Sequence, residues 1–144
     1  MKYQTIRDVD VKDKTVLVRV DYNVPLDNDG KITDDLRIRA SLPTLEYLRE
    51  AGAGKIILLS HLGRPEGKDE KLSLGVVAKA LGKMLPNVKF VKDVSGPEVE
   101  NAVAEMKDGE ILLLENLRFD PGEEANSAEF IKIIINNIAK AKSG

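Results

Sequence analysis

A histidine and an arginine follow an apolar run near the middle of the chain, and they give the first indication of chemistry. The run Lys55 to Leu59 leads directly into the segment Ser60-His61-Leu62-Gly63-Arg64-Pro65, and His61 is the only histidine among the 144 residues. In open α/β sheets, ligands bind just beyond the carboxyl ends of the strands. A histidine and an arginine there, on a backbone loosened by glycine, favour the binding of an anion, and of a phosphate above all.

Polar and charged side chains also follow two other apolar runs. Asp21 and Asn23 come just after the first run, and Arg118 comes just after the last. Arg37 lies early in a helix that we expect to start on the same side of the sheet. Because parallel strands end at one edge, these residues would surround one crevice. Arginine matches phosphate and carboxylate oxygens, and Asp21 and Asn23 can bond a hydroxyl. The expected ligand is small, carries at least two negative charges and has a hydroxyl.

Each of these residues also has a purely structural interpretation. Asp21 can cap a turn. His61 can be a strand-end histidine whose nitrogens are satisfied by neighbours. Arg64 and Arg118 can be solvated surface charges. What favours a binding site is that several such residues would meet at a single edge of the sheet.

The apolar runs alternate with helical periods, which is typical of an α/β protein. The predicted strands cover 15–20, 56–60, 88–91 and 110–114. The first of these is β-branched and nearly continuous, as expected of a strand that is covered on both faces. Strands and helices at this spacing imply βαβ units, and so a parallel sheet with helices on both faces in a Rossmann-like, three-layer arrangement.

The predicted helices begin at recognisable capping residues. Asp34 or Asp35 caps a helix that ends near Gly52, and we expect Pro43 to kink that helix or split it in two. Ser73 is the expected N-cap of the second helix. Ser95 opens a capping box for the third, with Glu98 as its partner. A last helix is predicted over 127–144.

Composition excludes several classes of function. The chain is 42% hydrophobic, has a formal net charge of -2 and contains no cysteine. The charge gives no reason to expect nucleic acid or an anionic membrane as a partner. The lack of cysteine excludes disulfides, thiol catalysis and cysteine-ligated zinc, and it is compatible with the cytoplasm. No apolar run approaches the roughly 20 residues that a membrane-spanning helix needs.

Four motifs resemble the phosphoglycerate kinase family, in order and at family spacing over about residues 1 to 130. They are Arg19 to Pro25 (R-V-D-F-N-V-P in the family), Thr33 to Ile38 (T-D-D-x-R-I), Ser60 to Pro65 (S-H-L-G-R-P), and Leu112 to Glu124 (L-L-L-E-N-x-R-F-x-P-G-E-E). The departures are mild, with Tyr22 in place of Phe and Asp120 in place of the commoner His.

The resemblance implies a two-lobed cytoplasmic enzyme of glycolysis. Such an enzyme transfers phosphate reversibly between 1,3-bisphosphoglycerate and ADP, with Mg²⁺ on the nucleotide. By position, the resemblance implies that Asp21 and Asn23 orient the hydroxyl of 3-phosphoglycerate. It makes Arg37 the catalytic residue, which contacts the carboxyl end and neutralises charge on the phosphoryl group in flight.

The S-H-L-G-R-P motif and the last motif supply the rest of the implied site. His61, Arg64 and Arg118 would hold the phosphate that is not transferred, and Leu62 and Gly63 belong to the same substrate-binding turn. The resemblance assigns no nucleotide-binding and no metal-binding residue to this chain.

Beyond residue 130 the resemblance weakens. The family continues into a further strand and a whole nucleotide-binding lobe, whereas this chain stops at Gly144. We therefore expect residues 1–130 to be a partial N-terminal lobe, followed by a poorly matching C-terminal helix over 131–144. Mg-ATP or Mg-ADP would bind the missing lobe, so we expect the isolated chain to be inactive.

The sequence also leaves other readings open. A non-catalytic anion-binding or interaction module derived from that fold would keep the same residues, and the chain could also be a misfolding-prone remnant. The final helix carries an apolar stripe of Ile131, Ile134, Ile135 and Ile138. Such a stripe, beside an open sheet edge, predicts self-association through this helix.

Overall fold

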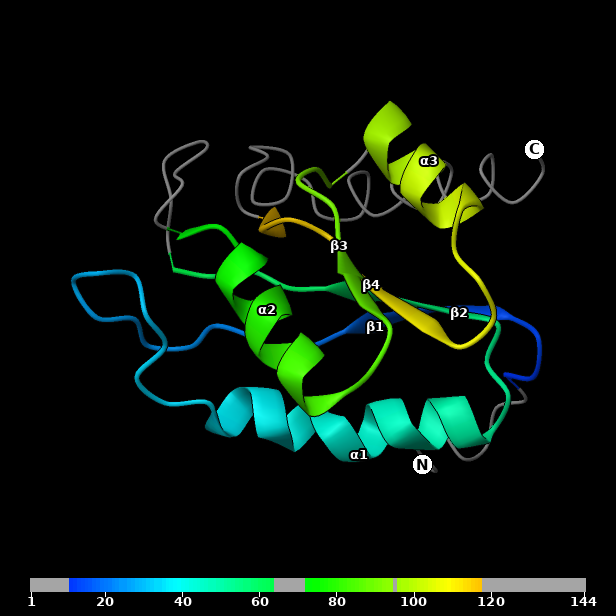
Figure 1. Cartoon of the computed structure of the whole chain (residues 1–144), viewed down its shortest axis with the longest axis horizontal. Coiled ribbons are helices and arrows are strands. Elements are labelled where there is room, and N and C mark those ends of the chain that lie inside the picture. The colour runs from blue at the N-terminus through cyan, green and yellow to red at the C-terminus, as the bar shows by residue number, and fades with distance from the viewer. Residues whose placement is uncertain (1–10, 64–71, 95, 118–144) are drawn as a thin grey trace, which may run out of the picture.

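Strands and helices alternate along the chain in the computed structural model, which describes residues 11–63, 72–94 and 96–117 (Figure 1). The elements are β1 (Thr15–Arg19), α1 (Leu36–Glu50), β2 (Lys55–Leu59), α2 (Gly75–Met84), β3 (Val88–Phe90), α3 (Pro97–Ala104) and β4 (Glu110–Leu113). The four strands form one sheet in the order β1-β2-β4-β3, and every neighbouring pair is parallel. The predicted parallel α/β sheet is confirmed, with strand boundaries within one residue of expectation.

The two central strands, β2 and β4, are buried on both faces, and this explains their unbroken apolar sequences. Successive side chains of a strand point to opposite faces. Ile56 and Leu58 accordingly pack into one hydrophobic core, while Ile57 and Leu59 pack into a second core on the other side of the sheet.

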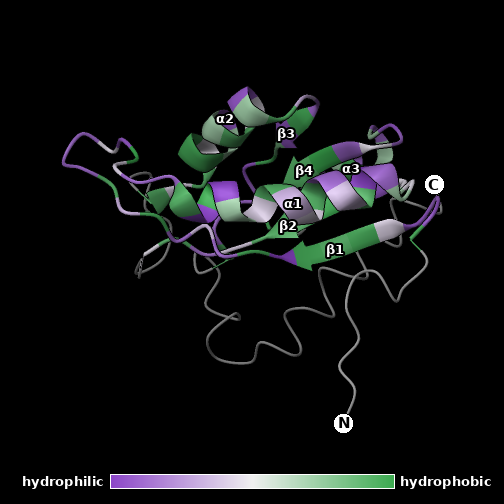
Figure 2. Cartoon of the chain, turned by 90° about the horizontal axis from the view of Figure 1, so that it is seen from below, coloured by the Kyte–Doolittle hydropathy of each residue, from purple (hydrophilic) through white to green (hydrophobic). Residues whose placement is uncertain are grey.

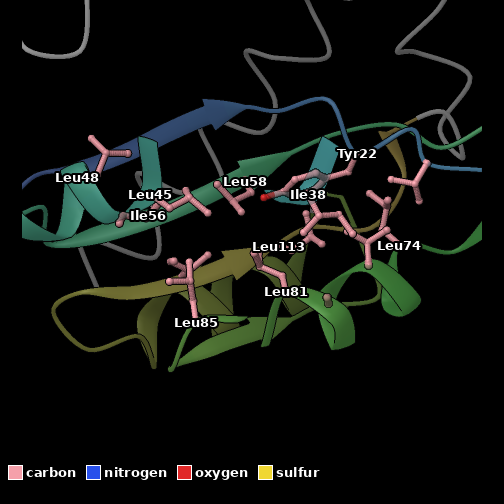
Figure 3. Packing of buried hydrophobic residues seen from close by; sticks show 14 of the residues in the cluster. Tyr22, Ile38, Leu45, Leu48, Ile56, Leu58, Leu74, Leu81, Leu85 and Leu113 are labelled. Carbon is pink, nitrogen blue, oxygen red and sulfur yellow. The ribbon is translucent and has the colours of Figure 1, made fainter. Parts of the chain in front are cut away.

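Helices cover both faces, as predicted for a three-layer arrangement. α1 and α2 lie on one side of the sheet and α3 on the other (Figure 1). The first core contains residues of α1, of α2 and of the central strands, and Figure 3 shows Ile38 and Leu45 beside Leu58, with Leu81 near Leu113. The second core joins the opposite face to Val99 and Val103 of α3. Figure 2 shows α1, with polar residues among its apolar ones, lying over strands that are largely apolar.

Three details of the predicted helices differ in the structure. Of the two outcomes expected at Pro43, a kink or a split, the split does not occur, because α1 runs unbroken from Leu36 to Glu50 with Pro43 inside it. Proline removes one intrahelical hydrogen bond, but the helix on its far side is held by Leu45 and Leu48, which are fully buried against the sheet.

The other two differences concern N-caps. Leu74, and not Ser73, is the N-cap of α2, and no side chain caps that position. Ser73 nevertheless accepts a hydrogen bond from the Gly75 N–H at 3.2 Å. Gly96, and not Ser95, is the N-cap of α3, with Pro97 as the first helical residue, and Ser95 itself lies outside the described residues.

All strands end at the same edge of the sheet, which is the expected place for a site. The loop after β1, the chain after β2, the chain after β4 and the start of α1 all lie on the left in Figure 1. Among the described residues, no helix is long and apolar enough to cross a membrane.

Candidate anion-binding site at the carboxyl edge of the sheet

The chain leaving β1 is fixed to the end of β2 by two successive hydrogen bonds. The Val20 N–H donates to the Leu59 carbonyl at 2.9 Å, and the Tyr22 N–H donates to Ser60 Oγ at 3.0 Å. The Tyr22 side chain is fully buried in the first core. Asp21 and Asn23 flank this anchor and are exposed and half-buried, respectively. A buried tyrosine thus places an acid and an amide at the edge of the sheet.

Asp21, Asn23 and Arg37 form a direct cluster. Asp21 Oδ1 accepts the Asn23 N–H at 3.2 Å and lies 3.5 Å from Arg37 Nη1. Arg37 also donates to the Asn23 carbonyl. The side chains of Arg37 and Asp21 are 50% and 65% exposed, so this ion pair adds little to stability and its charges are accessible to a ligand.

A hollow of about 580 Å³ adjoins this cluster. Its lining includes Asn23, Pro25, Leu36 and Arg37. A smaller hollow of about 280 Å³ is lined by Asp21 and the same arginine. Arg37 therefore borders two concave surfaces. Its planar set of donors suits a phosphate or carboxylate group of a small ligand.

The turn after β2 is held by Asn23. The Gly63 N–H donates to Asn23 Oδ1 at 2.8 Å. Gly63 has φ +62°, in the left-handed region, and a Cβ there would lie 2.9 Å from a Leu72 methyl carbon. Any other residue would strain the backbone and displace the Leu72 side chain, so this turn favours glycine. His61 is half-buried and Leu62 is buried at the same edge.

The chain after β4 contributes a buried polar pair, Glu115 and Asn116. The Glu115 carboxylate accepts hydrogen bonds from Ser73 Oγ at 2.7 Å, from the Leu74 N–H at 2.8 Å and from the Asn116 N–H at 2.8 Å. Asn116 Nδ2 donates to the carbonyls of Leu62 at 2.7 Å and Leu72 at 2.9 Å. This pair ties the end of β4 to the turn after β2 and to the start of α2.

The structure brings together most of the predicted site. Asp21, Asn23 and Arg37 touch one another, and Asn23 also touches Gly63. His61 and Leu62 lie in the same turn at this edge. Arg64 and Arg118 lie outside the described residues, as does the predicted helix over 127–144.

Sequence analysis missed the residues that support the site. Ser60, Glu115 and Asn116 are buried polar residues, and all three bond to the loops described above. The signal was present, because Glu115 and Asn116 follow an apolar strand directly and precede the apolar Leu117. Buried polar groups are retained where they are hydrogen-bonded, so a polar pair within an apolar stretch indicates an internal network.

Burial raises the pKa of the Tyr22 hydroxyl above its ordinary value of 10.0, and its hydrogen bond with Ser41 lowers it by less. The folded chain thus favours the neutral phenol. The stability that depends on this group is fully present below the unfolded pKa and is lost as pH rises through the higher folded pKa. We expect Tyr22→Phe to cost about 0.5–1.5 kcal/mol at pH 7 through the lost hydrogen bond.

Above pH 10 the same substitution is expected to become less costly, because phenylalanine cannot ionise. Urea unfolding at pH 7, 9 and 10.5 measures the difference in free energy of unfolding between the unmodified chain and Tyr22→Phe. Tyr3 and Tyr47 are present in both proteins, so their ionisation does not contribute to this difference. A difference that stays constant or grows with pH would show that Tyr22 does not limit alkaline stability.

Comparison with protein families gives a match over nearly the whole chain. The model described as "Phosphoglycerate kinase" matches residues 6–140. The chain belongs to the phosphoglycerate kinase family. The resemblance carried by the four motifs is thereby confirmed. Curated phosphoglycerate kinases agree with this assignment, at 57% identity over 136 residues for the protein of Coprothermobacter proteolyticus and 55% over 133 residues for that of Aquifex aeolicus.

Solved phosphoglycerate kinases share the fold. The structure from Coxiella burnetii superposes with a TM-score of 0.79 at 34% identity and covers 94% of this chain. The structure from Pyrococcus horikoshii gives a TM-score of 0.78 at 35% identity and covers 92% of it. The matched part is 34% of the Coprothermobacter relative and 33% of the Coxiella chain. The chain thus spans about a third of the length of the phosphoglycerate kinases it matches.

Proposed function

We propose that this chain carries the 3-phosphoglycerate-binding part of a phosphoglycerate kinase, which transfers phosphate between ATP and 3-phosphoglycerate. The observation that carries the proposal is the contact of Asp21, Asn23 and Arg37 with one another and with the turn at Gly63. An acid, an amide and an exposed arginine are thereby grouped at the carboxyl edge of a parallel sheet. That is where an α/β fold binds ligands, and the ligand expected from these groups is a hydroxylated anion.

The roles follow from the chemistry of each group. Asn23 Oδ1 is engaged by Gly63, which directs the Asn23 amide NH₂ toward bonding an oxygen of the ligand. Asp21 accepts the hydrogen of the glycerate hydroxyl. Arg37 neutralises negative charge on the carboxyl end and on the phosphoryl group during transfer. The protein supplies position and electrostatic stabilisation and forms no covalent bond with the substrate.

We propose that His61, Arg64 and Arg118 hold the phosphate that is not transferred, as the family motifs imply, and that Leu62 and Gly63 shape the turn between them. Two arginines and a histidine around one phosphate would set the orientation of the whole substrate. The support for Arg64 and Arg118 is their place in the matched motifs, since both lie outside the described residues.

The nucleotide belongs to a different part of the enzyme in this proposal. Within the described residues there is no group of three or more acidic or histidine side chains that could hold a metal ion. We propose that Mg-ATP or Mg-ADP binds the missing nucleotide-binding lobe, that this chain alone does not turn over, and that the enzyme acts in the cytoplasm. Residues 1–130 would then form the partial lobe, followed by a C-terminal helix over 131–144, of which the family match includes residues up to 140. A non-catalytic anion-binding module is the alternative.

We expect 3-phosphoglycerate to bind the isolated chain with saturable heat at millimolar concentration, and to bind it more weakly than a full-length relative. Removing one charge-assisted hydrogen bond costs about 1.5–3 kcal/mol, so Arg64→Ala is expected to weaken binding roughly ten- to a hundredfold. Isothermal titration calorimetry measures both proteins, with unphosphorylated glycerate as the control ligand. Heat that does not saturate, or that is the same for Arg64→Ala, would sink the proposal.

Self-association through the final helix stays a prediction, because that helix lies outside the described residues. Its support is the apolar stripe of isoleucines between Ile131 and Ile138. Sedimentation over a wide concentration range tests it, and a monomer at every concentration, unchanged by Ile134→Asp, would rule it out.

A further inference from the structure

One peptide unit in the turn after β2 is held from both sides by asparagine side chains. The Leu62 carbonyl accepts a hydrogen bond from Asn116 Nδ2 at 2.7 Å. The N–H of the next residue, Gly63, donates to Asn23 Oδ1 at 2.8 Å. These are the two polar groups of a single peptide bond. One asparagine follows β1 and the other follows β4, so this peptide links the ends of three strands.

The orientation of the Asn116 side chain is fixed by its partners. Nδ2 faces two carbonyl oxygens, those of Leu62 and Leu72. Carbonyl oxygens only accept hydrogen bonds, so the NH₂ end of the amide must face them. The side chain is fully buried, and its backbone N–H is held by the Glu115 carboxylate. Water cannot replace these bonds readily, so Asn116 is a rigid anchor.

Rotating the Leu62–Gly63 peptide would break both asparagine contacts at once. The following Gly63 already has a left-handed φ of +62°, so the path of the chain at this point depends on how that peptide is turned. Asn23 belongs to the proposed substrate site, and its Oδ1 is engaged by the same peptide. The orientation of this peptide therefore decides how Asn23 and the half-buried His61 are presented.

We propose that Asn116 is a positioning residue of the anion site: it holds the Leu62–Gly63 peptide in one orientation and, through it, Asn23 and His61. The identity of the ligand rests on the proposed function. The role of Asn116 in fixing the Leu62–Gly63 peptide does not depend on it. Asn116 itself is buried beneath the turn and acts through the peptide.

Asn116→Leu tests this role, because leucine has a similar branched shape, no hydrogen-bond donor and no charge. Asn101→Leu is the matched control, since Asn101 is an exposed residue of α3. Binding of 3-phosphoglycerate is followed by NMR on the ring protons of His61, the only histidine of the chain. Hydrogen exchange of the Gly63 amide reports the hold on the peptide. Circular dichroism checks that each variant is folded.

We expect Asn116→Leu to weaken 3-phosphoglycerate binding roughly tenfold or more, because a buried carbonyl loses its donor and the turn is released. The Gly63 amide is expected to exchange at least about tenfold faster in the same variant. Asn101→Leu should change neither quantity by more than about twofold, as is usual for an exposed residue. Unchanged exchange at Gly63 in a folded Asn116→Leu chain would overturn the proposal, whatever the affinity. Unchanged affinity would overturn it as well.

Failure of the proposed function has a different signature. If the unmodified chain shows no saturable shift of His61 with 3-phosphoglycerate, the ligand assignment fails, and the Gly63 exchange rate alone then decides the positioning role. If Asn116→Leu does not fold, the test is made on the unmodified chain. There the NMR coupling across the hydrogen bond from Asn116 Nδ2 to the Leu62 carbonyl is measured. Observing the coupling supports the hold on the peptide, and its absence overturns it.

Discussion

Replacing Glu115 with alanine is expected to lower the free energy of unfolding by about 3 kcal/mol or more. The Glu115 carboxylate is 3% exposed and accepts hydrogen bonds from Ser73 Oγ, the Leu74 N–H and the Asn116 N–H. Alanine would leave two buried N–H groups and a hydroxyl without their partner, at about 1–3 kcal/mol each if no water enters. Since domains of this size are stable by only about 5–15 kcal/mol, the variant would lose much of its margin.

Urea unfolding of the two proteins measures this effect. Glu46→Ala is the matched control, because Glu46 is an exposed residue of α1, and it should change stability by no more than about 0.5 kcal/mol. Glu115→Gln keeps the shape and one acceptor oxygen. Its loss of unfolding free energy should fall between those of Glu46→Ala and Glu115→Ala. A Glu115→Ala chain within about 1 kcal/mol of the unmodified chain would contradict the assignment of Glu115 as a buried anchor.

The fold was predictable because its signals are local. The strands are short apolar runs separated by helical periods, and the parallel order follows from that alternation. The meeting of Asp21, Asn23 and Arg37 was predictable for the same reason, since parallel strands and the helices between them alternate direction and bring their functional ends to one edge.

The bonding within the site was not predictable, because it depends on tertiary contacts. Asn23 and Gly63 are 40 residues apart in sequence, and only the packed sheet shows that the amide oxygen of Asn23 is occupied by a backbone N–H. Sequence analysis therefore assigned the side chains of both Asp21 and Asn23 to a ligand hydroxyl. In the structure the side-chain oxygen of Asn23 accepts the Gly63 N–H instead.

The same limit explains the errors about helix ends. Ser73 has the right chemistry for an N-cap, and its hydroxyl accepts the Gly75 N–H while it donates to the buried Glu115. The helix nevertheless starts one residue later than predicted, with Leu74 as its N-cap. Pro43 has a local penalty, which the burial of the following turns of α1 outweighs. At Pro43, contacts with residues distant in sequence thus outweigh a local preference.

The second large effect is expected at Arg37 and concerns turnover. In the proposed mechanism the guanidinium of Arg37 stabilises negative charge that develops during phosphoryl transfer. Removing one such donor costs enzymes about a hundred- to a thousandfold in kcat. Because this chain spans about a third of its relatives, the measurement needs the remaining part of the enzyme. Residues 1–140 can be joined to the remainder of the phosphoglycerate kinase of Coprothermobacter proteolyticus, which is 57% identical over the matched part.

The joined enzyme is expected to be active, and Arg37→Ala should lower its kcat by about a hundredfold or more. Arg39→Ala is the matched control. Arg39 lies on the same helix, is 64% exposed and pairs with Asp35 at 3.0 Å on the surface, so its loss should change kcat by less than about twofold. The chain by itself is expected to show no turnover, because no nucleotide is held in line with the acceptor. Two results would contradict the role of Arg37: a joined Arg37→Ala enzyme that keeps most of its kcat, or equal losses for Arg37→Ala and Arg39→Ala. The first result would show that the reaction does not need Arg37. The second would show that the charge of the helix, rather than the contact of Arg37 with the site, is what the reaction uses.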